Sequence, residues 1–311
     1  MLFNKNNNGS EELHALTGVF QAGAKFSAVR PELLQAGHEV SAIVGKEVIA
    51  AAQEIYDADN AADAELEFVD AVRRPVAYLA VLMFSKANTV VHGEQGRKMK
   101  TDENEKTPFA WMLDRDDREL RERYYGALDA LLLYLKENKP DLYAGMSSRA
   151  KLDGSIVRDL ADLEAVYPVE HSYYMLYRLT PMFLEMQDTR LRAIIGEDNL
   201  SALLAGESAI SASMISNSRK FVILTGLSTA VRRWGIDIFP LAIARRFAPS
   251  YQGNQESRAA TLNEIDWFLN QLLADIDETK KALLDEVNGS DGVPAVKLIP
   301  DNDPRNKYFT V

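Results

Sequence analysis

The chain has 311 residues, of which 47% are hydrophobic, and this length and apolar content suffice for two cores. Its formal net charge of −11 argues against a dedicated nucleic-acid binder, because attraction to phosphate needs a basic face. The chain has no cysteine, which excludes disulfides and thiolate metal sites. The amino terminus lacks the long apolar core of a signal peptide, so we expect a soluble protein made in a cytoplasm.

Apolar stripes at helical spacing predict a first helical unit over residues 1–145. Pro31 and Gly45 predict the start and the stop of one helix, since proline fits a first helical turn and glycine fits a helix end. Residues 76–84 are apolar almost all round, so we expect their helix at the centre of the unit. The predicted elements are a polar arm or capped entry (1–10), helices over 11–17, 31–44, 46–56 and 66–91, a charged connection (92–108) and a long helix (109–137).

Two charged segments of this unit are candidate interaction surfaces. The connection over residues 92–108 is long for a compact domain, and such loops are usually functional or disordered. Its basic residues indicate either solvated loop charge or contact with an acidic or polyanionic partner. On the following helix, opposite charges three and four residues apart predict a solvated or intersubunit ion-pair face. The candidate interface residues are Arg97, Lys98 and Lys100 in the connection, and Asp114, Arg115, Asp117 and Arg118 on the helix.

A connector over residues 146–170 leads into a second helical unit over residues 171–289. The connector contains a weak helical pattern over residues 156–166. The predicted elements of the second unit are a helix from Pro181 to a stop at Gly196, helices over 198–204 and 212–235, a connection over 236–254 and a final helix over 257–287.

The second unit repeats the pattern of the first about 150 residues later. Both contain a proline, an apolar stripe and a Val/Ile-Gly stop about fourteen residues further on. Downstream, Val72-Arg-Arg-Pro-Val lines up with Ser218-Arg-Lys-Phe-Val, and Arg245 and Arg246 lie in the region that matches the basic connection. The sequence therefore predicts an all-α fold made of two tandem, internally duplicated helical units.

The chain closes with a segment over residues 290–311 that three prolines prevent from forming a helix. An extended tail with apolar side chains either packs back on its own chain or reaches a neighbour. The apolar tail residues proposed for that interface are Val296, Leu298, Ile299, Tyr308 and Phe309.

Catalytic, metal and cofactor motifs are weak throughout the chain. One Glu-x-x-His pair, Glu11 to His14, is half of what a di-iron bundle needs, and the acidic residues 57–65 lack the spacing of a calcium loop. We expect a solvated turn there and a partly buried, hydrogen-bonded His38. Residues 93–98 do not match a phosphate-binding loop, and no serine sits in a nucleophile elbow. The sequence thus predicts no enzyme, no cofactor and no metal.

Residues 173–177 and 232–234 are the remaining candidates for contacts. The first group, Tyr-Tyr-Met-Leu-Tyr, is typical of an interface because Tyr and Met are enriched there. The second, Arg-Arg-Trp, contains a tryptophan that we expect to pack within the protein.

Two groups of motifs in the amino-terminal half carry a family resemblance. The first comprises Leu2-Phe3-Asn4, Glu12-Leu13, the Phe26-x-x-x-x-Pro31 spacing, the Ala36 helix and the Val44-Gly45-Lys-Glu-Val ending. The second runs from Gly96-Arg-Lys-Met-Lys to Trp111-Met-Leu-Asp-Arg-Asp-Asp117. These residues resemble a family of uncharacterised proteins encoded in phages and prophages of Bacteroidetes, whose genes typically lie among virion structural genes.

The helical unit is also similar to the head–tail connectors of tailed phages, which form a ring beneath the portal. The resemblance implies a structural virion protein of the neck region that is assembled in the bacterial cytoplasm. Its implied partners are copies of itself, portal and tail proteins, and DNA that passes through the lumen, with no membrane. The chain departs from the simplest adaptors by its length and duplication. The alternative is a cytoplasmic helical protein that binds a ligand or a protein without catalysis, with residues 93–107 closing over the ligand.

Overall fold

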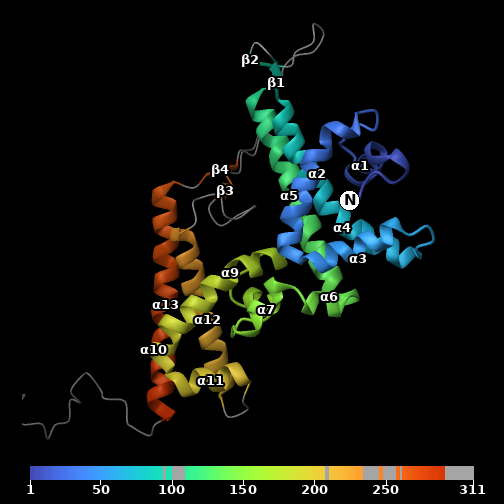
Figure 1. Cartoon of the computed structure of the whole chain (residues 1–311). Coiled ribbons are helices and arrows are strands. Elements are labelled where there is room, and N and C mark those ends of the chain that lie inside the picture. The colour runs from blue at the N-terminus through green and yellow to red at the C-terminus, as the bar shows by residue number, and fades with distance from the viewer. Residues whose placement is uncertain are drawn as a thin grey trace, which may run out of the picture.

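The computed structural model of the chain has an all-α fold, which confirms the predicted class (Figure 1). It describes residues 1–93, 96–99, 109–206, 210–233, 245–247, 257–259 and 261–290. Two short antiparallel ribbons interrupt the helices: β1 (Val90–Gly93) pairs with β2 (Gly96–Met99), and β3 (Arg245–Phe247) pairs with β4 (Ser257–Ala259). The prediction of a connection without regular structure over 92–108 is therefore wrong for its first part. The pairing of β1 with β2 satisfies backbone hydrogen-bonding groups of both strands.

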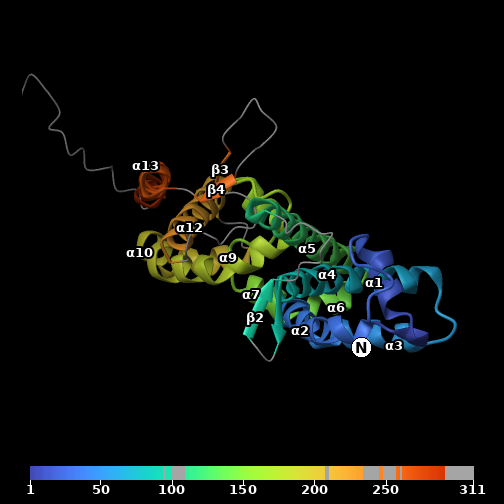
Figure 2. The same cartoon turned by 90° about the horizontal axis from the view of Figure 1, so that it is seen from above.

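In the first unit, α4 is the central helix, as its apolar sequence predicted. Helices α1, α2, α3 and α5 all pack against it, and Figure 2 shows α2 and α5 on its two sides. Residues 79–82 are all buried. The elements of this unit are η1 (Lys5–Asn7), α1 (Gly9–Thr17), α2 (Phe26–Val44), α3 (Lys46–Asp57), α4 (Asp63–Asn88) and α5 (Ala110–Asn138).

The connector and the second unit follow in the same order along the chain. Helix α6 (Pro140–Ala144) ends the first unit, and the connector contains α7 (Ser147–Asp153) and α8 (Leu160–Glu164), so the helix predicted over 156–166 is shorter than predicted. The second unit contains α9 (Tyr173–Met186), a single π-helical turn η2 (Gln187–Leu191), α10 (Arg192–Ile195), α11 (Glu197–Ala205), α12 (Ala212–Arg233) and α13 (Leu262–Ser290). The buried side chains of both units form one continuous hydrophobic cluster.

The two prolines do not start their helices, which corrects the predicted boundaries. Helix α2 begins at Phe26 with Pro31 inside it, and α9 begins at Tyr173 with Pro181 inside it. An interior proline costs about 3 kcal/mol, because it removes one backbone hydrogen bond and crowds the preceding turn. Burial of apolar side chains on both sides of each proline offsets this cost at about 1.5–3 kcal/mol each. The positions of proline and glycine in the sequence cannot by themselves predict that this cost is offset.

Three further boundaries differ from the prediction. Helix α4 ends at Asn88, because the chain enters β1 two residues later. Helix α13 begins at Leu262, since residues 257–259 form β4. The amino-terminal arm is not extended and polar: Leu2 and Phe3 are buried, and the Asn4 side chain accepts a hydrogen bond from the Gly9 backbone at 3.1 Å.

Both predicted glycine stops are confirmed, and they share one backbone conformation. Gly45 joins α2 to α3 with φ 95° and ψ 155°, and Gly196 joins α10 to α11 with φ 82° and ψ 168°. A positive φ of this kind suits glycine, because a Cβ atom would clash with the backbone. Each glycine ends one helix and begins the next without an intervening loop.

The order of elements therefore repeats from one unit to the next. A long helix with an interior proline, a glycine turn, a short helix, a long central helix, a β-ribbon and a 29-residue helix occur in this order twice. Figure 1 shows each ribbon beyond the same end of the two helices that it connects, α4 and α5 in one unit and α12 and α13 in the other. This order is what the predicted duplication requires.

Candidate interaction surfaces

A nearly buried arginine, Arg73 on α4, fastens the amino-terminal segment to the first unit. Its Nε donates to the Leu2 carbonyl oxygen at 2.8 Å, and its guanidinium forms ion pairs with Glu12 and with Asp70. The Arg73 side chain is 10% exposed. A charge at that depth is stable only when it is paired and hydrogen-bonded, so Arg73 makes the first residues part of the folded unit.

Arg219 on α12 makes the matching contacts in the second unit. Its Nε donates to the Ile156 carbonyl oxygen at 3.1 Å, and its guanidinium pairs with Asp162 at 2.8 Å. Ile156 and Asp162 precede α9 in the chain, just as Leu2 and Glu12 precede α2. In each unit, one arginine thus holds a backbone carbonyl and a carboxylate from the segment ahead of the first long helix.

Tyr56 completes the amino-terminal anchor. Its hydroxyl donates to Glu12 at 2.9 Å and accepts from the Lys5 backbone at 2.6 Å. Burial raises the pKa of Tyr56 to about 12, and the Glu12 carboxylate adds to that rise. The guanidinium of Arg73 lies 4.9 Å from the Phe3 ring and 5.1 Å from the Tyr56 ring, within cation–π range. All of these groups are engaged with one another, which fits a structural anchor.

A polar seam joins the two units where α5 meets the start of α9. Asp129 on α5 accepts a hydrogen bond from the Tyr174 backbone at 2.8 Å. Burial raises the pKa of Asp129 to about 6, although hydrogen bonds from Tyr174, Ser172 and Tyr173 work in the opposite direction. A carboxylate at a helix start also complements the helix dipole. Asp129 therefore acts as a cap that one unit supplies to the other.

A second contact of the seam lies one to two turns further along α5. Lys136 Nζ donates to the Asp159 carboxylate at 2.8 Å and contacts the Tyr173 hydroxyl at 3.0 Å. The Tyr125 and Tyr174 rings stack with centroids 5.4 Å apart. Residues 173–177, which the sequence predicted as an interface, thus face the first unit of the same chain, where Tyr173 and Tyr177 are buried.

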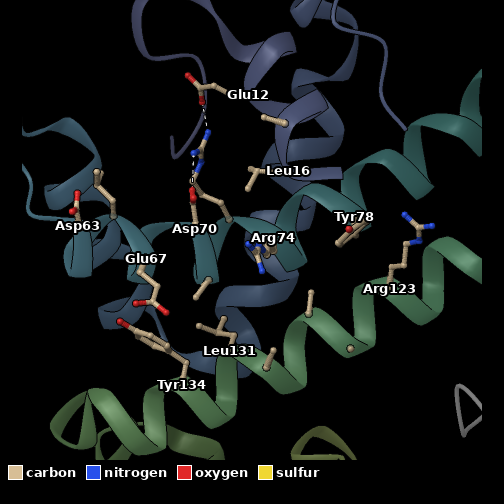
Figure 3. Close-up of a pocket in the computed structure, with 17 residues that line it drawn as sticks. Glu12, Leu16, Asp63, Glu67, Asp70, Arg74, Tyr78, Arg123, Leu131 and Tyr134 are labelled. Atoms are coloured by element: carbon tan, nitrogen blue, oxygen red, sulfur yellow. Dashed lines mark hydrogen bonds and ion pairs between the residues drawn. The ribbon is translucent and has the colours of Figure 1, made fainter. Parts of the chain in front are cut away.

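An open groove runs along the outer side of the first unit, between α1, α4 and α5 (Figure 3). Its volume is about 950 Å³. Larger charged, apolar and aromatic side chains line it together with small residues from all three helices: Ala15, Ala71, Gly126, Ala127 and Ala130. No sequence pattern indicates this groove, because its walls come from helices that are far apart in the chain.

Charges of opposite sign occupy different parts of this groove. Asp63 and Glu67, from the first turns of α4, lie toward one end, whereas Arg123 lies at the other and Arg74 between them (Figure 3). Asp63, Glu67 and Arg74 are exposed. The groove therefore has an acidic end and a basic end, which suits an extended segment with charges in the opposite order.

The predicted ion-pair face of α5 is engaged partly within the chain. Asp117 is half-buried and pairs with Lys86 on α4 at 3.7 Å, and Arg118 is half-buried as well. Asp114 and Arg115 are exposed. The face as a whole is therefore not a free subunit contact, and only its first residues remain available to one.

The predicted basic residues fall on the two ribbons. Arg97 and Lys98 lie in β2, paired with His92 and Val91, while Arg245 and Arg246 lie in β3. Lys100 and the tail residues Val296, Leu298, Ile299, Tyr308 and Phe309 lie outside the described part of the chain, as does Trp234 of the Arg-Arg-Trp group.

Large exposed apolar side chains, three of them aromatic, lie near the start of α5 and of α13, close to the ribbons. Phe109 and Trp111 are 67% and 53% exposed, and Leu262 and Trp267 are 74% and 65% exposed. Large side chains of this kind are favoured at protein interfaces, and tryptophan is prominent among interface hot spots. Corresponding ends of the two units therefore offer similar apolar surfaces, though not at matching helix positions.

A stripe of exposed leucines follows the outer face of α13. Leu262, Leu273 and Leu284 are eleven residues apart, close to three helical turns, so they lie along one line. Leu273 is 42% exposed and Leu284 is 39% exposed. The opposite face of α13 packs on α12 through buried residues that include Leu272 and Ile276. Helix α13 therefore packs on one side, and on its exposed side these leucines alternate with exposed polar residues such as Asp266, Asn270 and Asp277.

The remaining predicted sites carry no reactive arrangement. His38 is exposed, so the prediction of a partly buried side chain is wrong: α2 turns it away from α4. The acidic residues 57–65 run from the end of α3 through a short link into the first turn of α4, and all are exposed except the half-buried Ala61. Glu65 accepts a hydrogen bond from the Ala62 backbone at 2.8 Å. Across the residues that the structure describes, no group of three or more His, Asp or Glu could hold a metal ion. None of the described helices is long and apolar enough to cross a bilayer.

Comparison with known proteins gives one match. A family of unknown function (DUF6712) matches residues 43–151, about a third of the chain, from the end of α2 to α7. No curated protein and no solved structure matches the chain. The match includes α4 and α5, and so two walls of the groove.

Proposed function

We propose that the chain is a structural virion protein, a head–tail connector or neck component of a tailed phage that assembles with copies of itself into a ring. The ring bridges portal and tail proteins, and DNA passes through its lumen without sequence-specific binding. The protein is assembled in the bacterial cytoplasm, uses no cofactor and catalyses no reaction. Its two units arose by duplication, which the repeated element order and the matched contacts of Arg73 and Arg219 support.

The observation that carries this proposal is the uncovered face of α13. In the first unit, the matching 29-residue helix α5 lies between α4 and α9, so the second unit covers its outer side. In the second unit, Leu273 and Leu284 lie on the corresponding side and are exposed. The second unit covers α5, but nothing in the described chain covers the corresponding side of α13. Another chain can therefore pack against that side. The occupant that we propose is the first unit of another copy.

Such a contact is head-to-tail, because different surfaces of the two copies meet. Head-to-tail interfaces close into rings when the rotation between copies permits it and otherwise give filaments. The net charge of −11 favours a lumen lining with low affinity for phosphate. The exposed aromatic residues near the ribbons, such as Trp111 and Trp267, are the surfaces that we assign to portal and tail proteins.

The test combines mass measurement with an assembly assay. Light scattering coupled to size exclusion should give a mass several times that of one chain, alone or on addition of a portal protein. The double variant L273E/L284E should abolish assembly and keep the helical circular dichroism, because both side chains are exposed. A chain that stays monomeric alone and beside a portal would remove the proposal.

A second function is favoured by one observation, the groove of about 950 Å³ along α1, α4 and α5. A cavity of this size is in the range of small-molecule sites, so a cytoplasmic helical protein that binds a ligand or a protein is the alternative. The same light-scattering experiment separates the two functions. Saturable binding of a small molecule by a stable monomer would favour the alternative.

A further inference from the structure

The first long helices of the two units differ in length by one residue between their proline and the glycine that ends them. Pro31 and Gly45 are fourteen residues apart, whereas Pro181 and Gly196 are fifteen apart. The π-helical turn η2 interrupts the second helix between α9 and α10, while α2 is α-helical throughout. We propose that one residue inserted in the second copy produced this turn, and that the buried Gln187 within it fixes the connector to the second unit. The inserted residue rests on the duplication in the proposed function.

The buried side chains of the two helices follow the same order apart from one residue. After Pro31, the second, fifth, ninth and thirteenth residues are buried: Leu33, Ala36, Val40 and Val44. After Pro181, the second, fifth, sixth, tenth and fourteenth residues are buried: Phe183, Met186, Gln187, Leu191 and Ile195. The two patterns agree at every position once Gln187 is set aside. The surplus buried residue is therefore polar, and it is the first residue of η2.

A π turn accommodates one additional residue without disturbing the helix around it. Its hydrogen bonds join residues i and i+5, whereas those of an α-helix join i and i+4, so the turn contains one residue more. An insertion into an unbroken α-helix would instead rotate all following residues by about 100°. Leu191 and Ile195, which are 0% and 2% exposed, would then leave the buried face. The turn η2 thus absorbs the extra residue and keeps both leucine and isoleucine in the core.

Gln187 uses its side-chain amide to hold the backbone of the connector. Its Oε1 accepts a hydrogen bond from the Ile156 backbone at 2.9 Å, and its Nε2 donates to the Gly154 carbonyl oxygen at 3.0 Å. A carboxylate could not donate to Gly154, and an apolar side chain could make neither bond. Arg219 donates to the carbonyl oxygen of the same Ile156. The second unit therefore holds both backbone polar groups of Ile156.

The connector is tied to the first unit as well. Ser148 Oγ on α7 donates to the Ile43 carbonyl oxygen of α2 at 3.0 Å. Helix α7 also packs against α9 (Figure 1). The chain from Ser148 to Ile156 thus has a hydrogen-bonded attachment to each unit. Gln187 is therefore a positioning residue, because it fixes the place at which the second unit joins the first.

Hydrogen exchange of the full-length chain, followed at the Ile156 amide, tests the role of Gln187. Q187M replaces the amide by an apolar side chain of similar length. We expect Ile156 to exchange roughly 5-fold to 150-fold faster, the range for a buried backbone group that loses its partner. T180V is the matched control, because Thr180 is buried on α9 and donates to the Leu176 carbonyl oxygen of its own helix at 2.8 Å. No increase in Q187M, or an equal increase in T180V, would overturn this role.

Removal of a single residue tests the insertion. Without Gln187 the second helix has the spacing of the first, so urea unfolding should stay cooperative, at a lower midpoint because the connector loses its contacts. Removal of His38, an exposed residue of α2, is the matched control. It turns Val40 and Val44 by about 100° out of the core and should abolish the cooperative transition. Equal outcomes for the two deletions, both cooperative or both not, would overturn the insertion.

These outcomes are distinct from those that test self-assembly. A chain that assembles in light scattering, while the two deletions behave alike, would overturn the insertion and leave the proposed assembly standing. A chain that stays monomeric beside a portal, with faster exchange of Ile156 in Q187M, would remove the proposed assembly and leave the role of Gln187 standing.

Discussion

Helices α5 and α13 hold the same place in the two units and have different surroundings. Both have 29 residues. Leu120, Tyr124 and Leu131 of α5 are buried, and so are the residues 152 positions later in α13. The next strip of the helix differs, because Leu132 of α5 is fully buried whereas its counterpart Leu284 is 39% exposed. The same helical pattern can therefore be interior or surface, depending on whether another unit follows it.

A second comparison concerns the two arginine anchors. Arg73 and Arg219 make equivalent contacts, but their side chains are 10% and 37% exposed. The deeper anchor holds the amino-terminal segment, and the shallower one holds the connector between the two units. Arg73 and Arg219 thus make the same kind of contact at two depths.

The largest expected effect is a difference in the free energy of unfolding between variants of Arg73 and of Arg219. R73M removes the partner of Glu12 and should lower the free energy of unfolding by about 3–5 kcal/mol, because a carboxylate is left unpaired in a poorly solvated place. R219M should cost about 1 kcal/mol, since water screens its more exposed pair. Urea unfolding followed by circular dichroism measures both. Equal costs would show that depth does not distinguish the anchors.

The next effect compares matching leucines on the two long helices. L132A should lower the free energy of unfolding by about 2–5 kcal/mol, because it leaves a cavity in a packed core. L284A should change it by no more than about 0.5 kcal/mol, as expected for an exposed site. Urea unfolding of the monomeric L132A and L284A variants measures both changes. A large cost at Leu284 would mean that α13 is already covered within the chain.

A smaller effect should appear as a pH dependence of the free energy of unfolding, which arises at the seam between the units. The folded Asp129 carboxyl has its pKa raised from 3.8 to about 6, so the folded state holds this proton more tightly than the unfolded state. The free energy of unfolding should therefore fall by roughly 1–3 kcal/mol as the pH rises from about 4 to above 6. D129N should remove this contribution, because asparagine has no proton to lose.

Urea titrations across that pH range measure the slope for the wild type and for D129N. D277N, at an exposed position of α13, is the control for the loss of one carboxylate. A slope that persists unchanged in D129N would assign the pH dependence to other groups.

The smallest expected effect concerns the exposed start of the charged face on α5. D114N and R115Q should each change the free energy of unfolding by less than about 0.5 kcal/mol, because neither side chain is buried. If this face contacts the next copy, the same variants should weaken self-association in light scattering. Unchanged assembly would remove Asp114 and Arg115 from the proposed interface.

The sequence by itself determined the helical class, the central place of α4, the glycine turns at Gly45 and Gly196 and the order of the long helices. These follow from local rules, since apolar periodicity and a residue that accepts positive φ act within a few turns of chain. The alignment of Arg73 with Arg219 was also visible in the repeat, but its meaning was not, because each partner lies in a segment outside the aligned helix.

Only the tertiary structure decided where the helices begin around Pro31 and Pro181, which tyrosines join the two units, and that α1, α4 and α5 enclose a groove. Each of these features depends on burial or charge shared between segments that are distant in sequence. Periodicity identifies an apolar stripe, but the neighbour that covers the stripe is fixed by packing. For this reason α5 and α13 have similar sequence patterns, although the exposure of their matching residues differs.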